Sequence, residues 1–126
     1  NKCDSRAFKI QRYNYLSQDE LDLILQQADL GICLSDQDGT SYILFEYALH
    51  GIPVLTTSLM SQELGEHCLS FAPDSSRIDV ARSLYYSFSS QSSISLLRSA
   101  AIKARDHVIN TLPDINSDSM RDIFDL

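Results

Sequence analysis

Glycine is scarce in this sequence, and its positions exclude a common nucleotide-binding pattern. The four glycines lie at positions 31, 39, 51 and 65, so no GxGxxG turn is present. A dinucleotide-binding domain of the usual kind is excluded, because that turn needs glycines for its tight bend and its close approach to the pyrophosphate. A response-regulator receiver is also disfavoured, because the sequence shows no lysine placed to accompany an acidic cluster at successive strand ends.

Basic residues are also few. Ten lysines and arginines stand against seventeen aspartates and glutamates, which gives a net charge of −7. We therefore expect neither nucleic acid nor an anionic membrane surface as a partner of this segment. No apolar run approaches the ~20 residues of a membrane-spanning helix. The longest such run is broken by Glu46 and His50, and no signal peptide is recognisable.

Cysteine and histidine do not form metal-binding patterns. Cys3, Cys33 and Cys68 are an odd set without CxxC spacing, which predicts buried thiols in a reducing, cytoplasmic compartment. The three histidines are far apart and form no HxxH or HExxH pattern. We expect no metal and no cofactor from these residues.

Length and composition are those of one globular domain. The chain has 126 residues, of which 44% are hydrophobic, so we expect a single α/β domain over 1–126, with C-terminal helices over 94–126 packed on it. The chain begins at Asn1 and not at a methionine, which suggests a fragment of a longer protein.

The most informative stretch runs from Leu30 to Thr57. Apolar runs at 30–34 and 53–55 predict strands buried on both faces of a parallel sheet. Between them, the polar turn at 38–41 predicts a helix start, and Gly51 predicts its end. The unit is strand, turn, helix, strand, as in a Rossmann-like α/β fold with a mostly parallel sheet flanked by helices.

Glu46 interrupts a helix that is otherwise apolar or aromatic on every side. We expect this helix to be buried nearly all round, so the carboxylate needs a partner, because burying an unpaired charge costs several kcal/mol. Two alternatives stay open at this point. The partner is either an internal group, such as His50, a tyrosine or a backbone amide, or it is a ligand hydroxyl.

The unit resembles the C-terminal nucleotide-sugar-binding domain of retaining glycosyltransferases of the GT-B fold, the group 1 family. That family carries a serine, then an acid–glycine turn, then a helix with Glu-Ala-Met-Ala-x-Gly-x-Pro-Val-Val. Seven residues separate the family's two acids, and Asp38 and Glu46 keep that spacing. The matching residues here are Ser35, Asp38-Gly39-Thr40-Ser41 and the run EYALHGIPVL that begins at Glu46.

The resemblance implies a role for each matching residue. Glu46 would accept hydrogen bonds from the ribose hydroxyls of a nucleoside diphosphate sugar, and Asp38 would hold the donor sugar as the catalytic residue. The amides of Gly39, Thr40 and Ser41, after Ser35, would face the diphosphate. A carboxylate suits a diol, and fixed donors stabilise a leaving diphosphate. Transfer would retain the anomeric configuration without an obligatory metal.

The resemblance covers roughly residues 8–110 and only the later part of the family's domain. The earlier part would supply two strands and a basic pair that neutralises the diphosphate, and nothing here fills that role. The acceptor-binding N-terminal domain would belong to the same parent chain, so the segment alone is expected not to transfer sugar. Asp38 is also one methylene shorter than the family's usual Glu.

Two competing interpretations stay open. Asp36-Gln37-Asp38 matches the DxD pattern by which other glycosyltransferases hold a metal, although this pattern is common by chance. The other interpretation is a non-catalytic binding or scaffold domain that kept the fold, which the missing basic pair favours.

The flanking segments predict further elements. We expect an edge strand over 8–13, a helix over 18–28 opened by a Ser17–Glu20 capping box, a short strand over 67–71 and a serine-rich connector over 87–93. Two amphipathic helices should follow, with a short terminal helix after Ser117. The predicted core positions of the two helices are Ile78, Ala81, Leu84, Tyr85 and Phe88, then Ile94, Leu97, Ala101, Ala104 and Val108.

Overall fold

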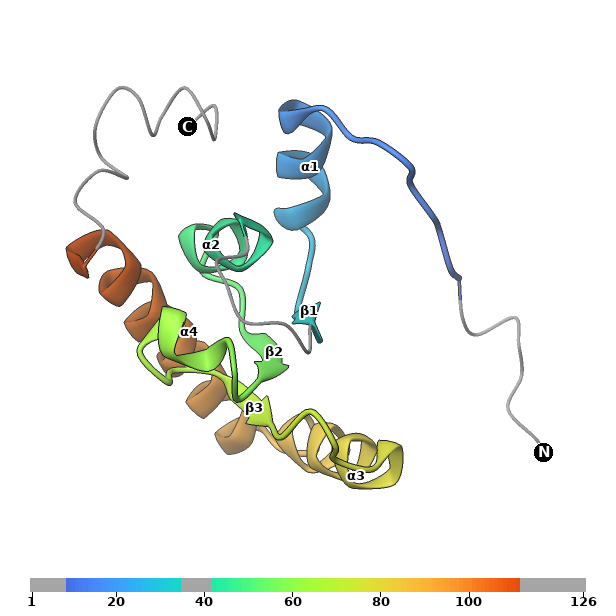
Figure 1. The fold of residues 1–126 in the computed structure, drawn as a ribbon, viewed down its shortest axis with the longest axis vertical. Coiled ribbons are helices and arrows are strands. Elements are labelled where there is room, and N and C mark those ends of the chain that lie inside the picture. The colour runs from blue at the N-terminus through green and yellow to red at the C-terminus, as the bar shows by residue number, and fades with distance from the viewer. Residues whose placement is uncertain (1–8, 35–41, 112–126) are drawn as a thin grey trace.

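A computed structural model of the chain describes residues 9–34 and 42–111. Its strands form one parallel sheet with the order β1-β2-β3, and helices lie on both sides of it (Figure 1). This arrangement confirms an α/β, Rossmann-like architecture. The elements are α1 (Gln18–Leu25), β1 (Gly31–Cys33), α2 (Tyr42–Leu49), β2 (Val54–Thr57), the 3-10 helix η2 (Ser61–Leu64), β3 (Leu69–Phe71), α3 (Arg77–Ser87) and α4 (Gln91–Thr111).

The register of the sheet brings the carboxyl ends of all three strands to one edge. Gly31 pairs with Val54, and Leu55 pairs with Leu69, each in parallel. β2 is the central strand, and all four of its residues are buried, as predicted for a strand covered on both faces.

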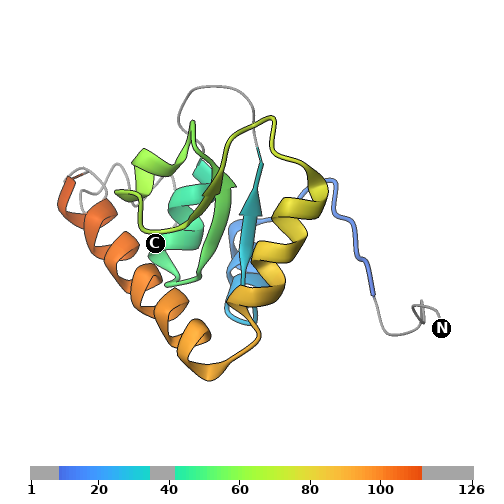
Figure 2. The ribbon, with the colours of Figure 1, turned by 90° about the horizontal axis from the view of Figure 1, so that it is seen from below.

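The hydrophobic core lies on one side of the sheet, where α2 and α4 pack. Figure 2 shows α4 and α3 on opposite sides of the sheet, with α2 between α4 and the strands. The spacing of the α4 core positions 97, 101, 104 and 108 is helical, and all four are buried as predicted. The core cluster consists of Leu44, Phe45, Ala48, Val54, Met60, Leu64, Ala104 and Val108.

Two glycines permit close packing around this core. A side chain on Gly31 would meet the Tyr47 ring at 2.5 Å from its Cδ2 atom, so β1 and α2 approach closely only without a Cβ there. Gly65 ends η2 at a φ of 63° and lies against the His107 ring. The left-handed conformation favours glycine at that turn.

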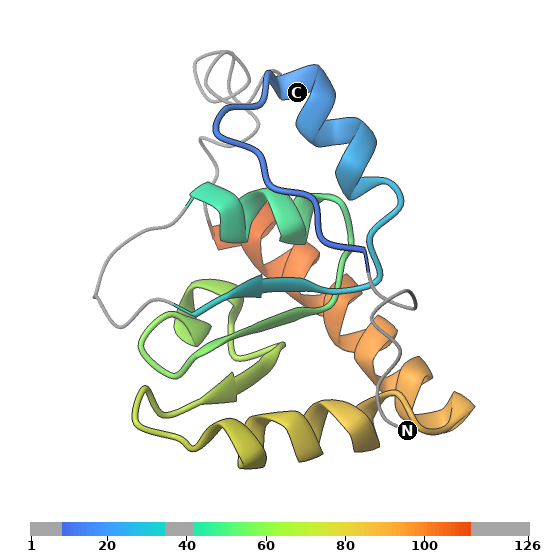
Figure 3. The ribbon, with the colours of Figure 1, turned by 90° about the vertical axis from the view of Figure 1, so that its right-hand side faces the viewer.

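The prediction for the α3 face is wrong. No residue of α3 is buried, and Ile78 and Tyr85 are 64% and 71% exposed. The helix lies beside the β3 edge of the sheet and packs against α4, as Figure 3 shows from the side. A helical period finds an apolar stripe but does not show whether the sheet extends far enough to cover it.

The predicted strand at 8–13 is also wrong over its described part, Lys9 to Tyr13, which has no strand pairing and is exposed. Alternation of apolar and polar residues does not make a strand without a neighbour to pair with. β1 is less buried than predicted, because Ile32 and Leu34 are 49% and 56% exposed. It is an edge strand in the described sheet.

Other boundaries shift modestly. α1 ends at Leu25 and not at Ala28, and the predicted connector at 87–93 is shorter, because α4 already begins at Gln91. α2 is exposed at Tyr42 and therefore is not buried all round. The helix predicted after Ser117 lies outside the described residues. Within 9–34 and 42–111, no helix combines the length and apolarity that crossing a membrane requires.

Candidate functional site

The predicted site segment connects the carboxyl end of the sheet to α2. β1 ends at Cys33 and α2 begins at Tyr42. A ligand in an open α/β sheet binds beyond the carboxyl ends of the strands. The predicted residues Ser35, Asp38, Gly39, Thr40 and Ser41 lie outside the described residues, so their contacts stay predictions.

Glu46 is the predicted site residue that the structure describes. It lies in the second turn of α2 and is only 3% exposed. Its Oε1 accepts a hydrogen bond of 3.1 Å from Nε2 of Gln18 on α1. Its Oε2 has no hydrogen-bond partner among the described residues. Among the described residues, the carboxylate therefore has an internal hydrogen-bond partner for one oxygen and none for the other, which lies 3.8 Å from Nδ1 of His50.

Two further side chains lie beside this carboxylate. Nδ1 of His50 lies 2.8 Å from the backbone oxygen of Glu46, and Nε2 of His50 lies 3.4 Å from Oδ1 of Asp22. Nε2 of Gln18 also donates to Oδ1 of Asp22 at 3.0 Å. We call Gln18, Asp22, Glu46 and His50 the α1–α2 polar cluster. Gln18 and Asp22 are four positions apart on α1, and His50 follows Glu46 by four positions just past the end of α2, where its amide still donates to the Glu46 carbonyl at 3.1 Å. This spacing places each pair on one side of its helix.

Burial raises the pKa of Glu46 above its ordinary value. The hydrogen bond from Gln18 and the charge of His50 oppose this shift, whereas the nearby Asp22 carboxylate adds to it. A raised pKa means that the buried carboxyl holds its proton more tightly than an exposed one. A cation or hydrogen-bond donor that binds at Oε2 would favour the ionised form.

Tyr47 fixes α2 on β1. Its ring lies against Gly31, and its hydroxyl donates to the backbone oxygen of Ile32 at 3.4 Å. Burial raises the pKa of this phenol, with Cys33 adding to the shift. The neutral, donating form is therefore favoured, and α2 is held at the β1 edge by both packing and a polar contact.

A small pocket of about 190 Å³ opens at the carboxyl ends of the strands. Its basic residue is Arg77, the first residue of α3. From the sequence, no residue was expected to replace the family's basic pair, so this position was missed. The signal available was the Ser76 cap, which places Arg77 directly after the β3 turn. The pocket is lined by Leu34, Thr57, Phe71, Ala72, Pro73, Ser75, Arg77 and Val80.

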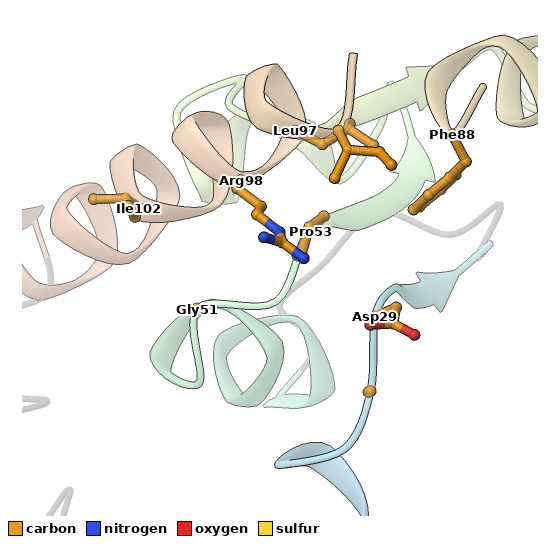
Figure 4. Close-up of a pocket in the computed structure, with 9 residues that line it drawn as sticks. Asp29, Gly51, Pro53, Phe88, Leu97, Arg98 and Ile102 are labelled. Carbon is orange, nitrogen blue, oxygen red and sulfur yellow. The ribbon is translucent and has the colours of Figure 1, made fainter. Parts of the chain in front are cut away.

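A larger pocket of about 530 Å³ lies at the opposite, amino end of the strands. Asp29 precedes β1 and Pro53 precedes β2, and both line it together with Arg98 of α4 (Figure 4). In the close-up, Arg98 extends from α4 toward Pro53. This pocket does not coincide with the predicted site, because it opens at the other end of the sheet.

The sequence predicts buried thiols, but the two described cysteines, Cys33 and Cys68, are only half-buried, and neither forms a disulfide within the described residues. Burial raises the pKa of the Cys68 thiol to about 11, with Glu66 adding to the shift. A thiol with such a pKa stays protonated near neutral pH and is a poor nucleophile.

Comparison of the chain with protein-family models, with curated proteins and with solved structures found no match.

Proposed function

We propose that this chain is the donor-binding part of a glycosyltransferase that uses a nucleoside diphosphate sugar with retention. The observation that carries the proposal is Oε2 of Glu46, which has no hydrogen-bond partner within 9–34 and 42–111 and is buried on the helix that follows the predicted phosphate-binding turn. A ribose hydroxyl is a donor that satisfies such an oxygen. The parallel sheet supports the proposal, because its strand ends lie where nucleotides bind in this architecture.

The remaining roles follow from the resemblance. Asp38 would hold the donor sugar, with the amides of 39–41 toward the diphosphate. Arg77 is a basic residue of the pocket at the strand ends and would add positive charge there. An acceptor-binding domain of the parent chain would complete the enzyme, so the segment alone binds donor without transferring sugar.

A non-catalytic scaffold domain is the second candidate. The hydrogen bond from Gln18 to Glu46 favours it, because an internal amide already meets part of the need for a partner. The two candidates differ in one measurable property. A donor-binding domain binds nucleoside diphosphates, and a scaffold does not.

Titration with uridine, guanosine and adenosine diphosphates, followed by amide NMR, tests the proposal. We expect one of the three to shift the amide signals of 39–46. Glu46→Gln should weaken that binding about tenfold, since a hydrogen bond to a charged group contributes roughly 1.5–3 kcal/mol. The matched control is Glu63→Gln on η2, which should bind as the unmodified chain does. Absence of any shift with all three nucleotides would favour the scaffold.

A further inference from the structure

The α1–α2 polar cluster contains the donor set of a divalent-cation site. One ligand atom from each of Asp22, Glu46 and His50 lies within 4.8 Å of the other two. Two carboxylates with one imidazole suit Zn²⁺ and its first-row neighbours, whereas Mg²⁺ and Ca²⁺ prefer oxygen ligands only. The sequence shows no metal motif because these ligands come from two helices far apart in the chain.

The backbone fixes which nitrogen of His50 is available. The Glu46 carbonyl oxygen is an acceptor 2.8 Å from Nδ1, so the ring carries a proton on Nδ1 and donates it there. Nε2 then directs its lone pair toward Oδ1 of Asp22, another acceptor. A positive charge between Nε2 and Oδ1, either a proton on Nε2 or a metal ion, makes this contact favourable. Metal-binding histidines commonly use the second ring nitrogen in this way.

The distance between these atoms leaves room for a metal ion. Nε2 of His50 and Oδ1 of Asp22 are 3.4 Å apart. A charge-assisted hydrogen bond would bring such atoms to about 2.7–2.9 Å. Two ligands each about 2.1 Å from a tetrahedral Zn²⁺ lie roughly 3.4 Å from one another. The separation therefore fits two ligands of one metal ion, and it also fits a polar contact without an ion.

Glu46 supplies an independent observation. Its Oε2 is buried without a hydrogen-bond partner among the described residues, and it lies 3.8 Å from Nδ1 of His50. The Asp22 carboxylate lies near Nε2 of the same imidazole ring, and its side chain is 30% exposed. A bound cation would neutralise both carboxylates, and the exposed side of Asp22 gives it a path from solvent.

We propose that the α1–α2 polar cluster binds one divalent transition-metal cation, with Asp22, Glu46 and His50 as its ligand residues and with Oε2 of Glu46 as the carboxylate oxygen that the cation would satisfy. A fourth position remains for water. This inference does not rest on the proposed function. The cation site and the proposed nucleotide site compete for Glu46, because a cation bound to Oε2 excludes a ribose hydroxyl from the same oxygen. Zn²⁺ should therefore weaken nucleotide binding.

Calorimetric titration of the metal-free 126-residue chain with ZnCl₂ tests the site. We expect saturation at one ion per chain, and tetrahedral absorption bands when Co²⁺ replaces Zn²⁺. His50→Gln and Asp22→Asn should each weaken Zn²⁺ binding by more than about tenfold, since loss of an outer-shell partner alone costs that much. Circular dichroism confirms that each variant is folded, and the partly exposed Asp22 makes its variant the safer one.

His67→Gln is the matched control, because His67 lies outside the cluster and should leave Zn²⁺ affinity unchanged. The proposal is overturned if the chain shows no saturable one-to-one binding, or if Asp22→Asn binds Zn²⁺ as tightly as His67→Gln. The cluster would then be an imidazolium–carboxylate ion pair. If the chain binds Zn²⁺ but no nucleoside diphosphate, the result contradicts the proposed function and supports the cation site.

Discussion

At the scale of single residues, the buried carboxylate of Glu46 is the group on which both proposals depend. Its carboxylate is buried between α1 and α2, where Gln18 satisfies one oxygen and leaves the other without a described partner. Such a group is costly in the folded state unless it is protonated or paired. Its energetic contribution should therefore depend on pH and on what is bound beside it.

The free energy of unfolding should report this dependence in metal-free buffer. A carboxyl whose pKa is raised on folding stabilises the folded state. This contribution is fully present when the pH is below the pKa of the unfolded state, near the ordinary 4.5, and it is lost as the pH rises through the raised pKa of the folded state. Glu46→Gln cannot ionise, and its oxygen still accepts from Gln18. The variant should gain stability over the unmodified chain as pH rises from 4 to 7.

Urea denaturation at several pH values measures this difference. Other titrating groups are common to both chains and cancel in the comparison. A stability difference that stays constant from pH 4 to 7 would show that the buried carboxyl titrates normally.

The residue scale also shows how far sequence reasoning reaches. Glu46 stands out because it is an acid in an apolar helix, and His50 follows four residues later, just past the end of α2, so both could be named from local pattern. Gln18 and Asp22 could not, because Gln18 lies 28 residues before Glu46 and meets it only after folding. Arg77 reaches the strand ends for the same reason.

At the scale of elements, the contact between β1 and α2 depends on one missing side chain. Gly31→Ala would drive a methyl group into the Tyr47 ring, so we expect a loss of about 1–3 kcal/mol in the free energy of unfolding. Tyr47→Phe should not relieve this loss, because the clashing ring atoms remain. Tyr47→Ala should relieve it, which a double-mutant cycle would reveal as a favourable coupling. Additive effects would contradict the close packing.

Helix caps give a second prediction at this scale. Ser17 forms a complete capping box with Glu20, whereas Ser76 caps α3 by accepting from the Asp79 amide. Ser17→Ala should cost about 1 kcal/mol of global stability, because α1 carries the buried Leu25 and the cluster residues. Ser76→Ala should cost less in urea denaturation, because α3 has no buried residue and frays without disturbing the core. Equal costs would contradict this distinction.

The Ser17–Glu20 capping box was predicted correctly, because capping depends on residues three positions apart. The buried face of α4 was also predicted correctly, since its apolar stripe meets α2. The apolar stripe of α3 has the same helical pattern and stays exposed. What separates the two helices is the element that each one meets, because α4 packs against α2 and η2, whereas α3 packs mainly against α4. No local pattern encodes that difference.

At the scale of the whole molecule, the core is one-sided. α2 and α4 bury Leu44 completely, whereas Ile32 on β1 is 49% exposed. Leu44→Ala should therefore cost about 2–5 kcal/mol, the usual range for a fully buried leucine. Ile32→Ala should cost about 1 kcal/mol or less, because much of its side chain already contacts water. Thermal denaturation would compare them, and similar losses would indicate that the open face of β1 is covered in solution.

The way α1 is attached has a consequence for experiment. Its one buried side chain is Leu25 at the carboxyl end, and Gln18 and Asp22 face the other helix through polar contacts. A proton or a cation bound between Asp22 and His50 should therefore determine how stably the whole of α1 packs on the rest of the molecule. When a cation is bound, deuterium uptake by the backbone amides of 18–25 should become slower. Binding at a few side-chain atoms would then be measured as the ordering of the whole helix.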